Sequence, residues 1–190
     1  MELCKSGVPA KVEEAIMNGA NVNAHNWREH MTALMWAAKE GHAEVAELLL
    51  KHGADIEAKD RDNGTALMWS ALRGKTETVE LLLRYGADTT PEDKHSGWCM
   101  TALMWAAREG HADVAELLLS YGVDVNSKNK NNKTALMSAA FLGRADVAEL
   151  LLRYGADIKA KDNNGYTALM WATRYEHTET ADLLRRYGSK

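Results

Sequence analysis

Histidines next to acidic residues are the first side chains in this sequence that could do chemistry. His42-Ala-Glu44 and His177-Thr-Glu179 match the start of a zinc-deaminase signature, in which His binds the metal and Glu transfers protons. No Pro-Cys-x-x-Cys follows either of them. The sequence also lacks the motifs of zinc proteases, phosphate-binding loops, serine hydrolases and dinucleotide sites. We therefore expect no catalytic residues, no metal site and no cofactor, and we expect that the protein is not an enzyme.

Cysteine offers a second chemistry, nucleophilic attack or disulfide formation. Cys4 and Cys99 are the only cysteines, and two are too few for a disulfide framework. Cys99 lies near His95, but no third residue is available to orient such a pair. This pair does not change the expectation of a non-enzymatic protein.

Tryptophan recurs at one position of a repeated motif. The spacing of that motif indicates which structural elements carry the tryptophans. The motif Thr-Ala-Leu-Met begins at residues 32, 65, 101, 134 and 167, with steps of 33, 36, 33 and 33 residues. Trp follows the motif in four copies and Ser138 in the other. A fixed period of this length indicates stacked supersecondary units that cover one another. One position filled by Trp in nearly every copy is more typical of packing than of a site.

Each unit predicts two helices and a turn-rich hairpin. In the first complete copy, Thr32 suits a helix N-cap and Gly41 ends that helix. A second helix over about 43–52 places Val and Leu on one face, and Gly53 ends it. Residues 54–64 are rich in turn formers. We therefore predict an all-α repeat solenoid of stacked helix–turn–helix units.

The motifs DNNGYTALMWA, GHAEVAELLLKHGADI and GHADVAELLLSYGVDVN carry a family resemblance. The chain resembles ankyrin-repeat proteins over nearly its whole length. Two departures recur, since Ala stands for the family's Pro and Met for its His, which in the family ties hairpins together. The resemblance implies one domain over 1–190, with a partial N-terminal repeat, four full repeats and a C-terminal capping repeat whose outer face Thr180 and Arg185 make polar. The expected repeats are roughly 1–25, 26–59, 60–92, 93–128, 129–161 and 162–190.

In this family, partners bind the concave face formed by the hairpin tips and the last turn of each first helix. These are also the positions where the copies differ most. The resemblance therefore implies these partner-binding residues: Trp27, Lys39, Glu40, Leu72, Arg73, Trp98, Arg108, Glu109, Phe141, Leu142, Tyr166, Arg174 and Tyr175.

The copies alternate as if a block of two units had been duplicated at an offset of 69 residues. The second and fourth units carry a basic–acidic pair after the first helix, whereas apolar residues occur in the third and fifth. This pattern predicts two related subsites about two repeats apart, one around Trp27, Glu40 and Leu72 and the other around Trp98, Glu109 and Phe141. A partner that touches both would gain affinity through effective concentration.

The leading hypothesis is a non-enzymatic module whose partner is another protein or a peptide. One alternative is a reader of methylated lysine or of a peptide tail. Its Trp cage would use Trp36 and Trp69, with Trp27 and Glu40 nearby, because some members of the family build such cages at this position.

Binding of nucleic acid or another anionic polymer in a basic groove is a further alternative. The formal net charge of −4 and the lack of nucleic-acid motifs disfavour it. No apolar run is long enough for a membrane span, and no signal peptide is visible. We therefore expect no membrane partner, a monomer, and a cytoplasmic (intracellular) location, provided that no N-terminal targeting segment is missing.

Overall fold

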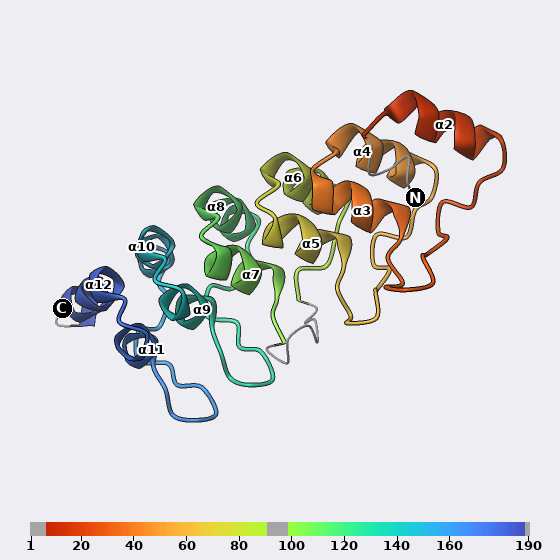
Figure 1. The fold of residues 1–190 in the computed structure, drawn as a ribbon. Coiled ribbons are helices and arrows are strands. Elements are labelled where there is room, and N and C mark those ends of the chain that lie inside the picture. Colours follow the sequence, from red (N-terminus) through yellow and green to blue (C-terminus); the bar gives the residue numbers. More distant parts are fainter. Residues whose placement is uncertain (1–6, 91–98, 189–190) are drawn as a thin grey trace.

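The helices stack in two parallel rows, as the computed structural model of residues 7–90 and 99–188 shows (Figure 1). The row of first helices comprises α3 (Ala33–Glu40), α5 (Ala66–Leu72), α7 (Ala102–Glu109), α9 (Ala135–Phe141) and α11 (Ala168–Arg174). The row of second helices comprises α2 (Pro9–Met17), α4 (Ala43–Lys51), α6 (Thr76–Arg84), α8 (Ala112–Ser120), α10 (Ala145–Arg153) and α12 (Thr178–Gly188).

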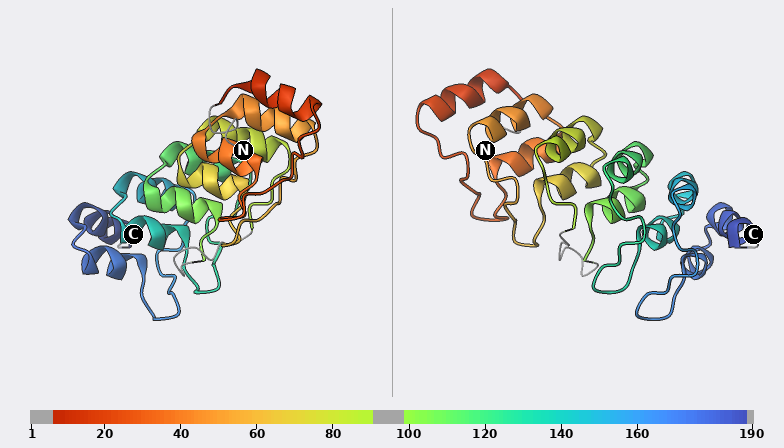
Figure 2. Two further views of the ribbon diagram at one scale, coloured as in Figure 1. Left: turned by 45° about the vertical axis from the view of Figure 1, so that its right-hand side comes forward. Right: turned by 180° about the vertical axis from the view of Figure 1, so that it is seen from behind.

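Both rows keep the order of the sequence, and the loops that join successive pairs project to the same side (Figures 1 and 2). Within the described ranges, β pairing is limited to a single bridge between His25 and Thr32. The predicted all-α repeat solenoid is confirmed. No helix in the described part of the chain is long and apolar enough to cross a membrane.

Threonine begins every first helix, as predicted. The Thr32 hydroxyl accepts a hydrogen bond from the Met35 amide at 3.3 Å, and the four other copies repeat this cap at 3.3–3.4 Å. It satisfies one of the amides that a helix N-terminus leaves unpaired. Gly41 then ends α3 in the left-handed conformation, at a φ of 85°.

The core is a ladder in which each pair of helices is covered by the next pair. The Leu and Met of the recurring motif, such as Leu34 and Met35, are only 1–3% exposed in the first four copies. Ala37 and Ala38 have no exposed surface and let neighbouring helices approach closely. Because first helices contact first helices and second contact second along the stack, no pair completes a core alone.

Side-chain hydrogen bonds also join consecutive pairs. The residue before α8, α10 and α12 reaches back to the carbonyl end of the first helix in the previous pair. His111 Nε2 lies 3.2 Å from the Leu72 carbonyl oxygen, and Arg144 Nε donates to the Arg108 oxygen at 3.1 Å. Gly74 leaves room for this contact, since a Cβ there would lie 2.6 Å from the His111 ring.

The hairpins are tied to one another without the family's histidine. Asn23 Nδ2 donates to the Gly53 carbonyl at 3.1 Å, and its Oδ1 accepts from the Asp55 amide at 2.8 Å. Asn126 repeats both bonds three repeats later, with Gly155 and Asp157. These asparagines therefore supply hydrogen bonds between hairpins that methionine in the helix cannot make.

The last pair departs from the expected cap. Arg185 is exposed, as predicted, but Thr180 is buried. The prediction that Thr180 makes the outer face polar is wrong, because this side chain lies on the inner side of α12. The outer face instead exposes Met170.

We predict that His111→Ala lowers the free energy of unfolding by about 1 kcal/mol, because the Leu72 carbonyl loses its partner. The measurement is the urea midpoint, followed by circular dichroism. His52→Ala is the matched control, because His52 is exposed at the end of α4. Equal losses in the two variants would contradict a role for this bond in joining the pairs.

Candidate functional site

Four aromatic rings gather where α9 meets α11. Phe141 ends α9, and its ring centroid lies 4.6 Å from that of Tyr175 and 5.5 Å from that of Trp171. Tyr166, from the preceding hairpin, lies 5.1 Å from Trp171. Edge-on and tilted contacts at these distances stabilise aromatic pairs. We call Phe141, Tyr166, Trp171 and Tyr175 the aromatic cluster.

Arginines from two pairs of helices flank the aromatic cluster. Arg108, at the end of α7, has its Cζ 5.2 Å from the Trp105 centroid and 6.0 Å from that of Phe141. Arg174 lies 5.7 Å from the Tyr166 ring and donates to its hydroxyl at 2.8 Å. Guanidinium groups over ring faces at these distances are held by cation–π attraction. Both arginines therefore present their charge in fixed positions.

Lys133 adds a third cation from the hairpin before α9. Its Nζ lies 5.0 Å from the Trp171 centroid. Burial is the main cause that lowers the pKa of Lys133, with Arg108 acting in the same direction and Asp162 opposing it. The ammonium is therefore poorly solvated, and another negative charge beside it would be favourable.

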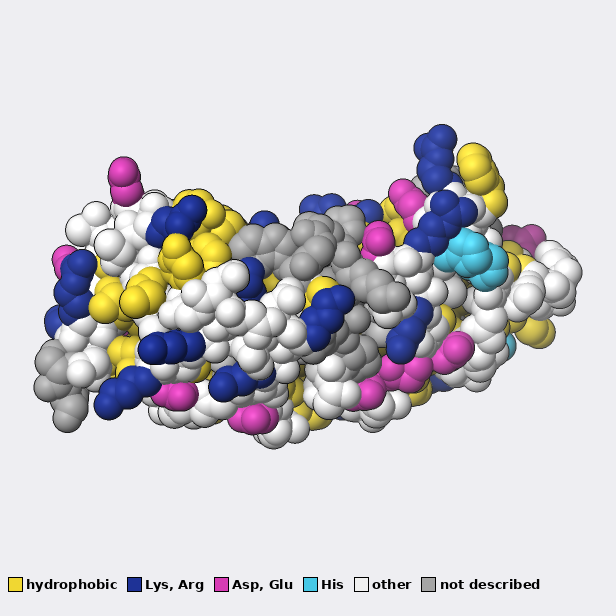
Figure 3. Space-filling view, turned by 90° about the horizontal axis from the view of Figure 1, so that it is seen from below, with side chains coloured by type: hydrophobic (Ala, Val, Ile, Leu, Met, Phe, Trp, Pro, Cys, Tyr) yellow, Lys and Arg dark blue, Asp and Glu magenta, His cyan; other side chains and the backbone are white. Residues whose placement is uncertain are grey.

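These three cations and the aromatic cluster form what we call the aromatic–basic surface: Arg108, Lys133, Phe141, Tyr166, Trp171, Arg174 and Tyr175. Seen from the hairpin side, hydrophobic and basic side chains lie next to one another toward the end that holds α9 and α11 (Figure 3). Tyr175 is 44% exposed, whereas Phe141 and Trp171 are half-buried.

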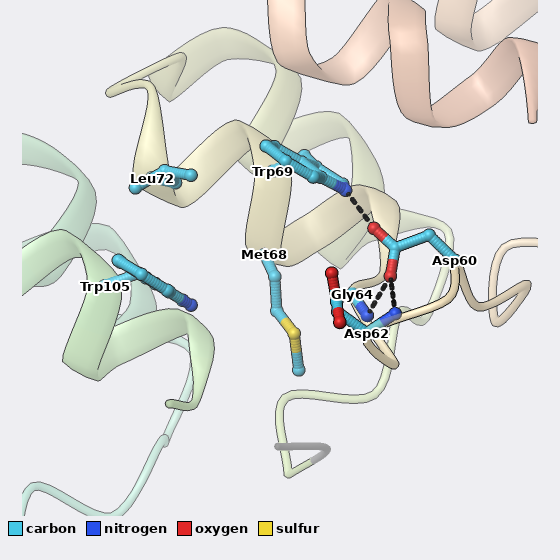
Figure 4. Close-up of a pocket in the computed structure, with 7 residues that line it drawn as sticks. All are labelled: Asp60, Asp62, Gly64, Met68, Trp69, Leu72 and Trp105. Carbon is cyan, nitrogen blue, oxygen red and sulfur yellow. Dashed lines mark hydrogen bonds between the residues drawn. The ribbon is translucent and has the colours of Figure 1, made fainter. Parts of the chain in front are cut away.

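A buried carboxylate fixes the indole ring of Trp69 and that of Trp171, two of the four tryptophans at the recurring position. Asp60 Oδ1 accepts from the amides of Asp62 and Gly64, and its Oδ2 accepts from Trp69 Nε1 at 2.8 Å (Figure 4). Asp162 makes the same contacts in the last copy, with Trp171 Nε1 at 3.1 Å. Trp171 is thus held both by its neighbours in the cluster and by Asp162.

Sequence reasoning missed Lys133 and Trp171. A nine-residue spacing could have revealed the anchored tryptophans, because each Asp stands nine positions before its Trp. Where Ser138 replaces Trp, the residue nine positions earlier is Asn129. Its amide donates instead to the Cys99 carbonyl at 2.9 Å. In these three copies Asp occurs with Trp and Asn with Ser, whereas the residues nine positions before Trp36 and Trp105 are Trp27 and Ser96.

At the other end of the stack, Lys39 lies between two tryptophans. Its Nζ is 4.7 Å from the Trp36 centroid and 4.6 Å from the Trp69 centroid. The space between these rings is therefore occupied by an ammonium group of the chain itself. Trp27 is 78% exposed on the preceding hairpin, and Glu40 is also exposed.

Leu72 is half-buried and lines a small pocket between α5 and α7. Trp69 and Trp105 line the same pocket, and the Trp69 indole nitrogen is directed toward Asp60 (Figure 4). The pocket has a volume of about 20 Å³, which has room for about one water molecule and is too small for a ligand.

The structure brings five of the thirteen expected residues together: Arg108, Phe141, Tyr166, Arg174 and Tyr175. Glu109 is half-buried with an oxygen 4.0 Å from Arg108, and Leu142 caps α9. Lys39 and Glu40 end α3, and Arg73 caps α5. Trp98 lies outside the described residues.

The family of the chain follows from its match to known repeats. A family model described as ankyrin repeats (3 copies) matches residues 1–93 and 103–190, and one described as ankyrin repeats (many copies) matches 71–119. The chain belongs to the ankyrin-repeat family. Ankyrin repeats are generally protein–protein interaction modules, and ankyrin-repeat proteins are typically non-enzymatic.

Across 7–90 and 99–188, no three His, Cys, Asp or Glu side chains gather as a metal site would require.

We predict that Asp60→Asn lowers the free energy of unfolding by about 1–3 kcal/mol, because the new amide cannot accept from both the backbone and the indole. Urea midpoints from tryptophan fluorescence and circular dichroism measure the loss. Asp113→Asn, at an exposed position on α8, is the control. If Asp60→Asn loses no more stability than this control, the carboxylate does not anchor Trp69.

Proposed function

We propose that the chain binds a partner protein through the aromatic–basic surface. The segment bound carries an aromatic or large aliphatic side chain next to carboxylates. The observation that carries the proposal is the aromatic cluster itself, in which neighbouring ring centroids lie 4.6–6.0 Å apart, among three cations. Aromatic residues and arginine dominate the binding energy of protein interfaces.

The fixed geometry of the cluster favours such a role. Trp171 is hydrogen-bonded to Asp162, and the Arg174 guanidinium to Tyr166, so these side chains lose little freedom on binding. The lowered pKa of Lys133 means that its charge is poorly solvated, so a carboxylate of the partner beside it would be stabilising.

The contact extends toward the N-terminal end of the stack in this proposal. There the exposed Trp27 and Arg73 offer a second apolar and basic group. A long partner segment would reach both ends, and each end would raise the effective concentration of the other. We assign Lys39, Glu40, Leu72, Trp98, Glu109 and Leu142 to the rest of this surface.

A cage for methylated lysine is less well supported. The Lys39 ammonium lies between Trp36 and Trp69, so a ligand ammonium would have to displace it. Nucleic acid could also use rings and cations together, but the net charge of −4 opposes it. Ankyrin-repeat proteins are commonly intracellular. We propose an intracellular location and a monomer that binds its partner.

We predict that peptides selected on the wild-type chain from a random phage-displayed library combine Asp or Glu with Phe, Trp or Leu. Their affinity should fall about tenfold or more in the double variant Arg174→Glu with Tyr175→Ala, because a ring and a cation are both lost. Isothermal calorimetry with the synthetic peptides measures this.

Arg153→Glu with Tyr154→Ala is the matched control. It changes the same Arg–Tyr dipeptide, here at the end of α10. Tyr154 is 43% exposed, and Tyr175 is 44% exposed. Equal losses in the two double variants would overturn the assignment to the aromatic–basic surface. Steeply salt-dependent binding of DNA or RNA of any sequence would favour the nucleic-acid alternative.

A further inference from the structure

The outer face of the last pair of helices exposes side chains that are buried in every earlier copy. Met170 is 50% exposed, whereas Met35, Met68, Met104 and Met137 at the same position are 1–3% exposed. Leu169 is half-buried, although its counterparts are 1–2% exposed. In the described part of the chain, nothing packs over this face as α5 packs over α3.

An open hollow of about 640 Å³ lies on the last pair of helices and the hairpin before them. Ile158, Leu169 and Leu184 give it an apolar lining. Three cations line it as well: Lys159 and Lys161 from the hairpin, and Arg185 from α12. Arg185 is paired with Asp182 at 2.5 Å, and its side chain remains 55% exposed. We call Met170 and these six residues the end face.

The shape of the end face fits a helix. In the earlier copies the Leu–Met positions pack against the helices of the following pair. An amphipathic helix could cover Leu169 and Met170 in the same manner, because side-chain ridges of one helix fill the grooves of another.

The charge of the end face selects the polar side of such a helix. The chain as a whole has a formal charge of −4, yet the charged residues that line the hollow are basic. Basic residues around an apolar floor attract carboxylates and repel cations, which adds specificity to apolar contact.

We infer that the end face docks an acidic amphipathic helix of a partner protein. The helix lies against α11 and α12 with its apolar stripe over Leu169 and Met170 and its carboxylates near Lys159 and Lys161. This site is separate from the aromatic–basic surface, since it involves none of the residues of that surface. It stands or falls independently of the function proposed above.

A designed helical peptide of about 18 residues, with Leu on one face and Glu on the other, is the probe; shorter helices are marginal in water. Its control replaces every Glu by Lys. Methyl NMR of the chain labelled at methionine gives a local readout, with the Met170 signal assigned from Met170→Leu. We expect the acidic peptide to shift the Met170 signal. The basic peptide should bind at least about tenfold more weakly.

Charge reversal provides the decisive variant. Lys159→Glu with Lys161→Glu should exchange the preference, so that the basic peptide binds more tightly than the acidic one. Lys51→Glu, at an exposed lysine on α4, should leave the preference unchanged. Circular dichroism checks that each variant is folded.

Several results would overturn the inference. One is a Met170 signal that neither peptide shifts, and another is a preference that the charge reversal leaves in place. A third is concentration-dependent self-association in analytical ultracentrifugation that Met170→Glu abolishes, because the occupant of the end face would then be a second copy of the chain.

Discussion

No pair of helices in this protein can bury its own Leu–Met face. Each face but the last is covered by the following pair, and the residues that precede α8, α10 and α12, such as His111, hydrogen-bond back to the pair before them. Stability is therefore shared between neighbours, as in other quasi-one-dimensional stacks. The same constraint sets the spacing of side chains along the surface, because equivalent residues are separated by one step of the stack.

The aromatic–basic surface is a product of that spacing. Arg108 comes from one pair, Phe141 from the next and Tyr175 from the last, and they meet because stacking places the ends of α7, α9 and α11 side by side. The second-helix residues also position this surface. Arg144 Nε donates a hydrogen bond to the Arg108 carbonyl oxygen. His177 Nε2 lies 3.0 Å from the Phe141 carbonyl oxygen. The scaffold and the candidate site thus depend on the same contacts.

Much of the fold could be predicted because it depends on local and periodic features. The Thr caps, the glycine ends and the period of 33 residues are visible in the letters alone. The repeat positions also placed Phe141 and Tyr175 at the ends of first helices. The burial of Thr180 also follows from the repeat register, because its counterparts Val45, Thr78, Val114 and Val147 are 0–1% exposed, and the polar side chain was the misleading signal.

The contacts within the candidate site were harder to predict, since they join different repeats. Lys39 lies between its own Trp36 and the Trp69 of the next copy, a geometry that no single repeat contains. Lys133 was not among the expected residues, and its position over Trp171 depends on the path of the loop.

Photo-crosslinking in native cells tests the central claim most directly. Benzoylphenylalanine replaces Tyr175 in one variant and Tyr154, which is equally exposed on the second-helix row, in the other. Mass spectrometry then identifies the adducts. If the aromatic–basic surface binds the partner, one protein should be captured from position 175 and not from position 154. Capture of the same protein from position 154, with none from position 175, would contradict it.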